Sequence, residues 1–129
     1  MRLLVDTHVL LWALAEPRRL SARATELIRT STNTLLVSAA SAWEIATKHR
    51  LGKLPHAGPI VAGYAMYLAM LRADELPIRS VHALRAGGFT VEHRDPFDRM
   101  LAAQAIVEGV PLLTDDPAFA GFPDLRTLW

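Results

Sequence analysis

Four acidic residues stand at comparable places along this 129-residue chain. Asp6 directly follows the apolar run 3–5, and Asp116 follows a second apolar run near the carboxyl end. Glu44 and Asp98 fall within the early turns of two predicted helices. Helix starts and the carboxyl ends of parallel strands meet at one edge of an α/β sheet. We therefore expect these four side chains to lie close together.

A cluster of four carboxylates has a predictable chemistry. Carboxylates without cationic partners repel one another, and such a cluster normally persists because it binds a metal ion. Oxygen ligands suit Mg²⁺ or Mn²⁺. Such ions near carboxylates most often serve phosphoryl chemistry, where they activate a water molecule and neutralise charge on the leaving oxygen. The acidic set is thus a candidate catalytic metal site.

Two of the acids also have an ordinary explanation as helix caps. Asp6 can cap a helix that begins near His8, since Asp is among the best N-cap residues. Asp116, which precedes Pro117, can cap a short turn in the same way. From the residues alone, both explanations stay open beside the metal site.

For the other two acids the capping explanation is weaker. Ser41 and Glu44 match a capping box, but the apolar pattern begins earlier, and if Ser38 caps that helix then Glu44 does no capping. Asp95 and Pro96 make a strong helix start, and Asp98 suits the helix dipole there. Because Asp95 already fills the cap, Asp98 can face inward.

Short apolar runs alternate with helical patterns along the whole chain. Strands are predicted at residues 3–5, 34–38, 75–78, 110–114 and 125–128. Helices are predicted at residues 8–14, 21–29, 39–51, 58–72, 80–88 and 97–108. This alternation favours one α/β domain over residues 1–129, with a mainly parallel sheet covered on both faces.

Composition narrows the class further. Half of the residues are hydrophobic, which indicates a globular chain, and the net charge of +1 neither demands nor excludes a nucleic-acid partner. Cysteine is absent, so disulfides and thiolate metal sites are excluded. The longest apolar run, 60–71, is too short to span a bilayer, and no signal peptide is visible. We expect a cytoplasmic protein without a membrane segment.

Several segments resemble, in order and spacing, the motifs of PIN-domain ribonucleases, and most closely those of VapC-type toxins of bacterial toxin–antitoxin pairs. The resemblance covers essentially the whole chain. It rests on residues 3–7 (LLVDT), 41–45 (SAWEI), 95–105 (DPFDRMLAAQA) and 112–116 (LLTDD).

The resemblance implies a three-layer α/β/α fold, dependence on Mg²⁺ or Mn²⁺, and endonucleolytic cleavage of RNA. It also implies a VapB-like antitoxin as partner and homodimerisation. Carried over by position, the metal-binding and catalytic set is Asp6, Glu44, Asp98 and Asp116. The supporting residues are Thr7, Thr114 and Asp95. Asp115 lies where the family pattern varies, and at His8 many relatives have a small or apolar residue, so the roles of these two residues stay open.

Basic residues near the acids are candidate contacts for RNA phosphates, namely Lys48, Arg94 and Arg99. The alternative for Lys48 is a helical ion pair with Glu44, four residues earlier.

A possible partner surface lies in the apolar helix predicted at 58–72. Its Met and Tyr side chains suit an adaptable interface. They are Tyr64, Met66, Tyr67 and Met70. We interpret this helix as a homodimer or antitoxin surface.

Two other functions fit parts of the pattern. The first is a catalytically inactive PIN-like module that binds RNA or protein. The second is a phospho-receiver-like domain, also a metal-binding parallel α/β fold. A receiver would need an acidic pair where this chain has Asp6 and Thr7, and a lysine after a late strand, whereas the last lysine here is Lys53.

Overall fold

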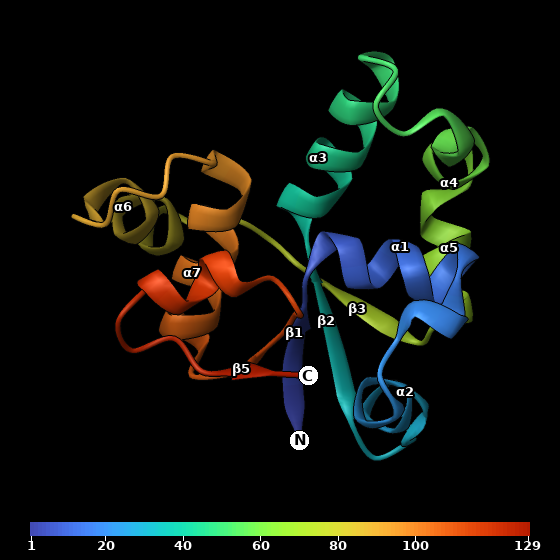
Figure 1. The fold of residues 1–129 in the computed structure, drawn as a ribbon, viewed down its shortest axis with the longest axis horizontal. Coiled ribbons are helices and arrows are strands. Elements are labelled where there is room, and N and C mark those ends of the chain that lie inside the picture. Colours follow the sequence, from blue (N-terminus) through green and yellow to red (C-terminus); the bar gives the residue numbers. More distant parts are fainter.

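The computed structural model describes residues 1–129 and shows a five-stranded sheet between two groups of helices (Figure 1). The strands are β1 Arg2–Val5, β2 Thr34–Ser38, β3 Ala73–Leu76, β4 Leu112–Leu113 and β5 Thr127–Leu128. All four neighbouring pairs are parallel, in the order β3-β2-β1-β4-β5. The predicted α/β class and parallel sheet are confirmed.

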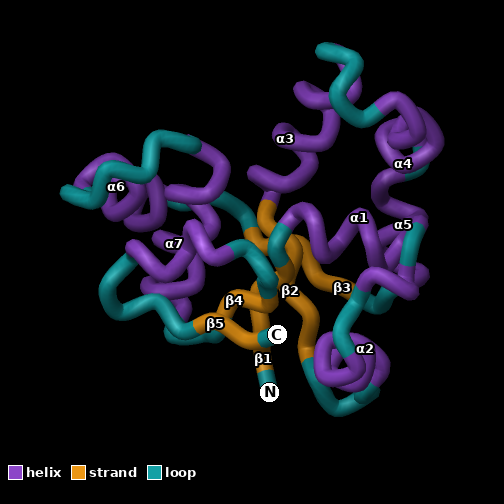
Figure 2. Tube along the Cα trace, viewed as in Figure 1, coloured by secondary structure: helices purple, strands orange, loops and turns teal.

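Seven helices surround this sheet (Figure 2). They are α1 Thr7–Ala15, α2 Ala22–Arg29, α3 Ala39–Arg50, α4 Gly58–Ala62, α5 Tyr64–Met70, α6 Ser80–Gly88 and α7 Pro96–Glu108. Three 3-10 turns join them: η1 Pro17–Arg19, η2 Pro55–Ala57 and η3 Pro117–Gly121. Helices α1, α2, α4 and α5 lie on one side of the sheet and α6 and α7 on the other, while α3 extends beyond the carboxyl end of β2 (Figure 1). None of these helices combines the length and apolar character needed to cross a membrane.

The sheet is apolar on both faces. Successive side chains of a strand point to opposite faces, and β1 illustrates this: Leu3 and Val5 pack into one buried cluster with α1, whereas Leu4 packs into the other with Leu101 of α7. Strands covered on both sides are expected to be almost continuously hydrophobic. The sheet therefore lies between two apolar layers, one on each face. The starts of α1 and α3 directly follow the carboxyl ends of β1 and β2.

Four predicted elements differ from the structure by more than one residue. The strands predicted at 110–114 and 125–128 shorten to Leu112–Leu113 and Thr127–Leu128. The single helix predicted at 58–72 is wrong: Gly63, with φ −118° and ψ 32°, separates α4 from α5. Glycine is a weak helix former because it loses the most backbone freedom on ordering. The third strand ends at Leu76 rather than Ile78, because Pro77 lacks the N–H that a continuing ladder would need.

Candidate active site

Asp6 lies at the junction of β1 and α1 and is almost completely buried, with 1% of its surface exposed. Its side chain makes no capping hydrogen bond to α1. Instead Oδ2 accepts a hydrogen bond from the hydroxyl of Thr114, at 2.7 Å, just beyond β4. Asp6 thus occupies the N-cap position of α1 as predicted, but its side chain does not cap the helix, and Thr114 holds this carboxylate at the edge of the sheet.

Glu44 also proves not to cap its helix. The N-cap of α3 is Ser38, whose hydroxyl accepts the backbone N–H of Ala40 at 2.9 Å. Ser41, the other half of the apparent capping box, has its hydroxyl 2.9 Å from the Thr7 hydroxyl in a buried contact that joins α3 to α1. Glu44 is left in the second turn of α3, facing inward.

The two carboxylate oxygens of Glu44 have different surroundings. Oε2 forms an ion pair with the ammonium group of Lys48, one turn further along α3. Oε1 is buried and has no hydrogen-bond partner. An unpartnered buried carboxylate oxygen is costly, and one found in a folded protein suggests a role or a missing ligand.

In α7, as in α3, the residue that caps the helix is not the acid that faces inward. Asp95 is the N-cap, and its Oδ1 accepts the backbone N–H groups of Phe97 at 2.9 Å and Asp98 at 3.3 Å. The predicted cap at Asp95 is confirmed. The side chain of Asp98 is buried, and its Oδ2 lies 2.9 Å from Nε2 of His93.

Asp6, Glu44 and Asp98 act on one another through their charges. Burial raises the pKa of Asp6 to about 6; the Thr114 hydrogen bond and the His8 charge lower it, and the charges of Asp98 and Glu44 raise it. Perturbed carboxyl pKa values of this kind are typical of functional sites.

The pKa of Asp98 is also raised, mainly by burial. The hydrogen bond from His93 counteracts this rise, and the nearby charges of Asp95 and Glu44 add to it. Three of the four predicted acids thus form one electrostatically connected group, which we call the acidic centre: Asp6, Glu44 and Asp98.

Asp116 is placed differently. It is half-buried at the start of η3, where its Oδ1 accepts the backbone N–H of Ala118 at 2.9 Å. The capping explanation therefore holds for this oxygen. Its backbone N–H donates to the hydroxyl of Thr114 at 3.1 Å. Because Thr114 also donates to Asp6, one hydroxyl links Asp116 to the acidic centre.

The predicted RNA-contacting cations differ in how they are engaged. Lys48 pairs with Glu44, as its alternative explanation required. Arg94 is exposed. The guanidinium of Arg99 donates to the backbone carbonyls of Ala86, Phe89, Val91 and His93. These four hydrogen bonds hold the loop before α7 in place.

The acidic centre can be compared with the needs of a divalent ion. Its oxygen donors suit Mg²⁺ or Mn²⁺, and the buried, unpartnered Oε1 of Glu44 is an oxygen that an ion would satisfy. No three His, Asp or Glu side chains lie close enough together to hold one ion as they stand. The residues therefore fit a divalent ion by donor type and burial.

Two residues of the site carried only weak signals in the sequence. His93 was recognisable only by its nearness to Asp98 along the chain. The position of Ser41, three residues before Glu44, places both on one face of α3, which is the signal that could have identified it.

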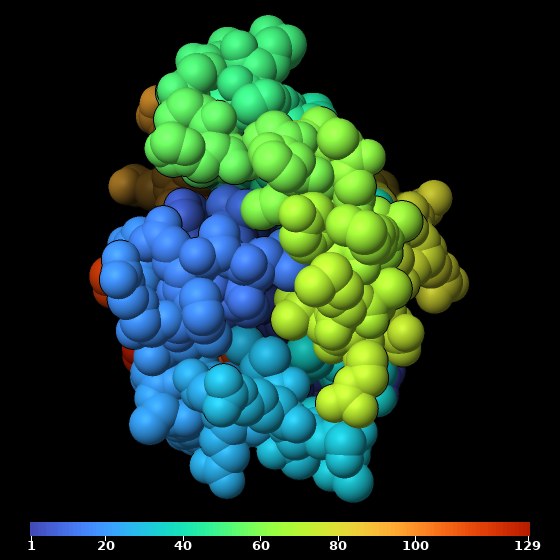
Figure 3. All heavy atoms as spheres, turned by 90° about the vertical axis from the view of Figure 1, so that its right-hand side faces the viewer, coloured from blue at the N-terminus to red at the C-terminus, as the bar shows by residue number.

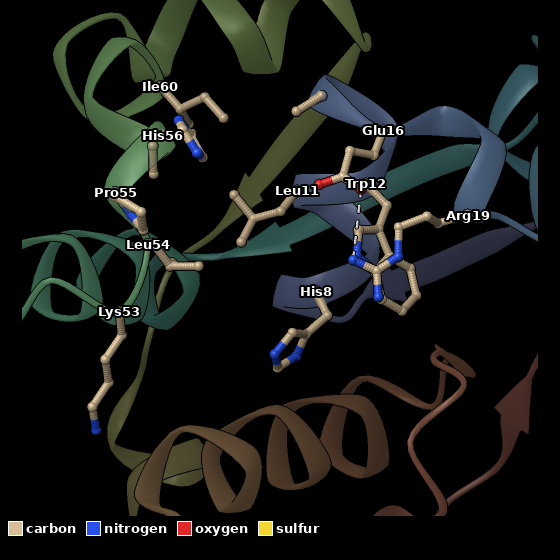
Figure 4. Close-up of a pocket in the computed structure, with 12 residues that line it drawn as sticks. His8, Leu11, Trp12, Glu16, Arg19, Lys53, Leu54, Pro55, His56 and Ile60 are labelled. Carbon is tan, nitrogen blue, oxygen red and sulfur yellow. Dashed lines mark ion pairs between the residues drawn. The ribbon is translucent and has the colours of Figure 1, made fainter.

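A hollow of about 240 Å³ lies beside α1, between this helix and the η2–α4 segment (Figure 4). His8, one residue after Thr7, lines it together with Trp12, Arg19 and Lys53. The Arg19 guanidinium lies 4.4 Å from the ring centre of Trp12 and pairs with Glu16 at 3.6 Å. No motif in the sequence predicted this hollow.

Comparison with known proteins adds the family. The sequence pattern of the PIN domain matches residues 3–125, and the chain belongs to this family. A comparison with curated protein sequences finds no match. Membership of the PIN family, together with the fold, leaves the phospho-receiver alternative without support.

Several solved structures share the fold over nearly the whole chain. VapBC2 from Rickettsia felis, bound to a promoter DNA fragment, superposes with a TM-score of 0.72 at 17% identity, covering 99% of this chain and 98% of that one. DNA-bound VapBC from Salmonella typhimurium gives 0.70 at 18% identity, with 99% and 97% covered. VapBC-1 from nontypeable Haemophilus influenzae gives 0.68 at 18% identity and the same coverage. At these identities the likeness is one of fold.

Proposed function

We propose that this protein is a single-domain, metal-dependent endoribonuclease over residues 1–129 and the toxin of a VapBC-type toxin–antitoxin pair. The observation that carries the proposal is the buried acidic centre at the carboxyl edge of a parallel sheet, with Oε1 of Glu44 left without a partner. Membership of the PIN family supports nuclease chemistry. That the superposed structures are VapBC complexes supports a toxin role.

The proposed ion is Mg²⁺ or Mn²⁺. Asp6, Asp98 and Asp116 would hold it directly, and Glu44 would bind a second ion or position the attacking water. When bound, such an ion lowers the pKa of that water and neutralises charge on the leaving oxygen. The side chains supply the geometry: in an in-line displacement, the water oxygen bonds to phosphorus while the opposite phosphorus–oxygen bond breaks.

The surrounding hydroxyls give the acids their orientation. Thr114 donates to Oδ2 of Asp6 and so holds this carboxylate at the carboxyl edge of the sheet. Thr7, through its contact with Ser41, fixes the start of α1 against α3, which presents Glu44. Asp95 holds the first turn of α7 and with it the position of Asp98.

For RNA binding, Arg94 is the strongest of the three proposed phosphate contacts, because it is exposed and directly follows His93, whose ring contacts Asp98. A phosphate contact by Arg99 would require it to exchange its four carbonyl partners. Replacing Arg94 with Ala should weaken RNA binding evenly across sequences and reduce its dependence on salt concentration by about one unit of slope.

The proposed partners are a VapB-like antitoxin and a second copy of the chain, acting in the cytoplasm where the RNA substrate is found. The α4–α5 segment forms one side of the molecule beside α1 and α2 (Figure 3). Met66 and Met70 of this segment are 58% and 68% exposed, more than methionine in a core would be. Hydrogen exchange of residues 58–70 should slow on partner binding; unchanged exchange would refute this surface.

The test of the proposed function is cleavage of a mixed RNA pool by the purified chain in Mg²⁺, in Mn²⁺ and in EDTA, with Asp6→Asn as control. We expect cleavage by the wild type that needs metal and is lost in the variant. If both proteins leave the same residual cleavage, the activity is a contaminant. The inactive PIN-like binding module is then the better account.

A further inference from the structure

Lys48 is a cation placed among carboxylates. Its ammonium group bonds to Oε2 of Glu44, whose side chain is 2% exposed, whereas the Lys48 side chain is 27% exposed. The pair therefore joins a buried acid to a side chain that reaches the surface. A lysine has a flexible stem of four carbons, so its ammonium group can leave this position by rotation of the stem.

The charges around Lys48 are those of the acidic centre and its neighbour. Burial lowers the pKa of Lys48, but the hydrogen bond and charge of Glu44 outweigh that effect, and the charges of Asp95 and Asp98 raise the pKa further. Every charged group that acts on Lys48 in this way is a carboxylate. Lys48 thus supplies positive charge to the acids that we propose bind the ion.

The two oxygens of Glu44 show what this arrangement leaves open. Lys48 satisfies Oε2, and nothing satisfies Oε1. The Lys48 ammonium group therefore neutralises part of the negative charge of the acidic centre, but it leaves Oε1 of Glu44 without a partner. A divalent ion would supply the missing charge, yet it would have to bind within a few ångströms of the Lys48 ammonium, which repels it.

We propose that Lys48 is a positioning residue that takes the place of a divalent cation at Glu44 when no metal is bound. Lys48 and the cation then compete for the Glu44 carboxylate. This inference rests on the proposed function, because it takes Glu44 to belong to the metal site. Such competition is described by a coupling free energy and is reciprocal. Lys48 weakens metal binding, and the metal weakens the ion pair between Lys48 and Glu44.

An ordinary helical ion pair would behave differently. Pairs four residues apart on a helix contribute little to stability and have no connection with a metal site. Removing such a pair would leave metal affinity unchanged. The affinity for a metal ion therefore distinguishes the two explanations.

The experiment is a calorimetric titration of the full chain with Mn²⁺ in the absence of RNA. Lys48→Met should bind Mn²⁺ roughly tenfold more tightly than the wild type. Lys48→Arg keeps the charge and should stay near the wild-type affinity. Lys53→Met is the matched control, since Lys53 is exposed three residues beyond α3 and its loss removes the same charge; its affinity should be unchanged.

Thermal unfolding provides a second measurement. In EDTA, Lys48→Met should unfold at a lower temperature than the wild type, because Glu44 loses its partner. In saturating Mn²⁺ this difference should shrink or reverse. Lys48→Gln, which keeps a hydrogen-bond donor, serves for both measurements if Lys48→Met does not fold. In a Glu44→Gln background, Lys48→Met should have no further effect on Mn²⁺ affinity.

The outcomes separate this inference from the proposed function. If the wild type binds Mn²⁺ and Asp98→Asn abolishes binding, but Lys48→Met binds equally or more weakly, the role of Lys48 is refuted and the metal site stands. If the wild type shows no Mn²⁺ binding that depends on Asp98, both proposals fail.

Discussion

Two segments of this chain begin a helical turn with Asp-Pro, and their acids are used differently. At the start of α7, Asp95 accepts the backbone N–H groups of the first turn, and Asp98 faces the acidic centre. At the start of η3, Asp116 itself accepts the N–H of Ala118. At the start of α7, capping and the proposed metal binding thus fall to two different carboxylates. At the start of η3, both fall to Asp116.

This difference predicts how strongly each acid contributes. Asp98 is buried, and its charge acts on Asp6. Asp116 is half-buried and joined to the centre through Thr114 alone. We therefore expect the α7 segment to carry more of the chemistry than the η3 segment, and the following variants test that ranking.

The largest effect is expected for Asp98→Asn. The amide keeps the size of the side chain and removes the charge that an ion needs. Cleavage of a defined RNA should fall about a thousandfold, since loss of a metal ligand removes charge stabilisation worth several kcal/mol. Single-turnover rates in Mn²⁺ would measure this, and a loss below about tenfold would place Asp98 outside the metal site.

Asp6→Asn should lower cleavage to an extent comparable with Asp98→Asn and should also stabilise the metal-free protein. Because the pKa of Asp6 rises from 3.8 to about 6 on folding, the folded protein holds a proton that the unfolded chain has released between pH 4 and 6. Stability in EDTA therefore falls as pH rises through this range. The total is about 3 kcal/mol, at 1.36 kcal/mol for each pKa unit.

The measurement for Asp6 is thermal unfolding in EDTA at several pH values. The variant should unfold several degrees above the wild type at pH 7, and the two should converge towards pH 4. A difference that does not change with pH would contradict the assigned cause.

Asp116→Asn should have a smaller effect on activity. We expect a loss of about a hundredfold in cleavage, less than for Asp98→Asn, because Asp116 is half-buried and one of its carboxylate oxygens accepts the N–H of Ala118. Stability should hardly change, because Asn is as good an N-cap as Asp. Asp116→Ala should add a loss of about 1 kcal/mol in the free energy of unfolding, measured with urea. Equal stability of the two variants would show that the cap is unimportant.

The smallest effect on activity is expected at Asp95. Asp95→Ala removes the cap of α7 and should cost about 1 kcal/mol of stability by urea unfolding. Loss of the cap loosens the first turn of α7 and so the position of Asp98. Cleavage should fall only a few-fold, because the Asp98 carboxylate itself is retained. Asp95→Asn, which retains the cap, is the control and should resemble the wild type in stability.

The parts of this structure that follow from the sequence are local or periodic. Ser38 and Asp95 were recognisable as caps because a cap depends on residues within three positions. The parallel sheet followed from apolar runs that alternate with helical patterns. Within the α4–α5 segment, the apolar run 60–71 continued through Gly63, so pattern alone did not locate the break.

The contacts that join distant residues could not be read from the pattern. The bond from Thr114 to Asp6 spans 108 positions and depends on β4 lying beside β1. The four carbonyl partners of Arg99 depend on the path of the loop before α7. Residue type and spacing placed the acids at the right edge, whereas their partners depend on how the chain folds around them.

The most direct measurement is the single-turnover rate of RNA cleavage for Asp98→Asn beside Asp95→Asn, in Mn²⁺ and in EDTA. The two variants make the same chemical change three residues apart. We predict that Asp98→Asn loses cleavage while Asp95→Asn stays within a few-fold of the wild type. EDTA should abolish the activity of the wild type and of Asp95→Asn. Equal rates for the two variants, or cleavage that survives EDTA, would contradict the assignment of the acidic centre as the catalytic metal site.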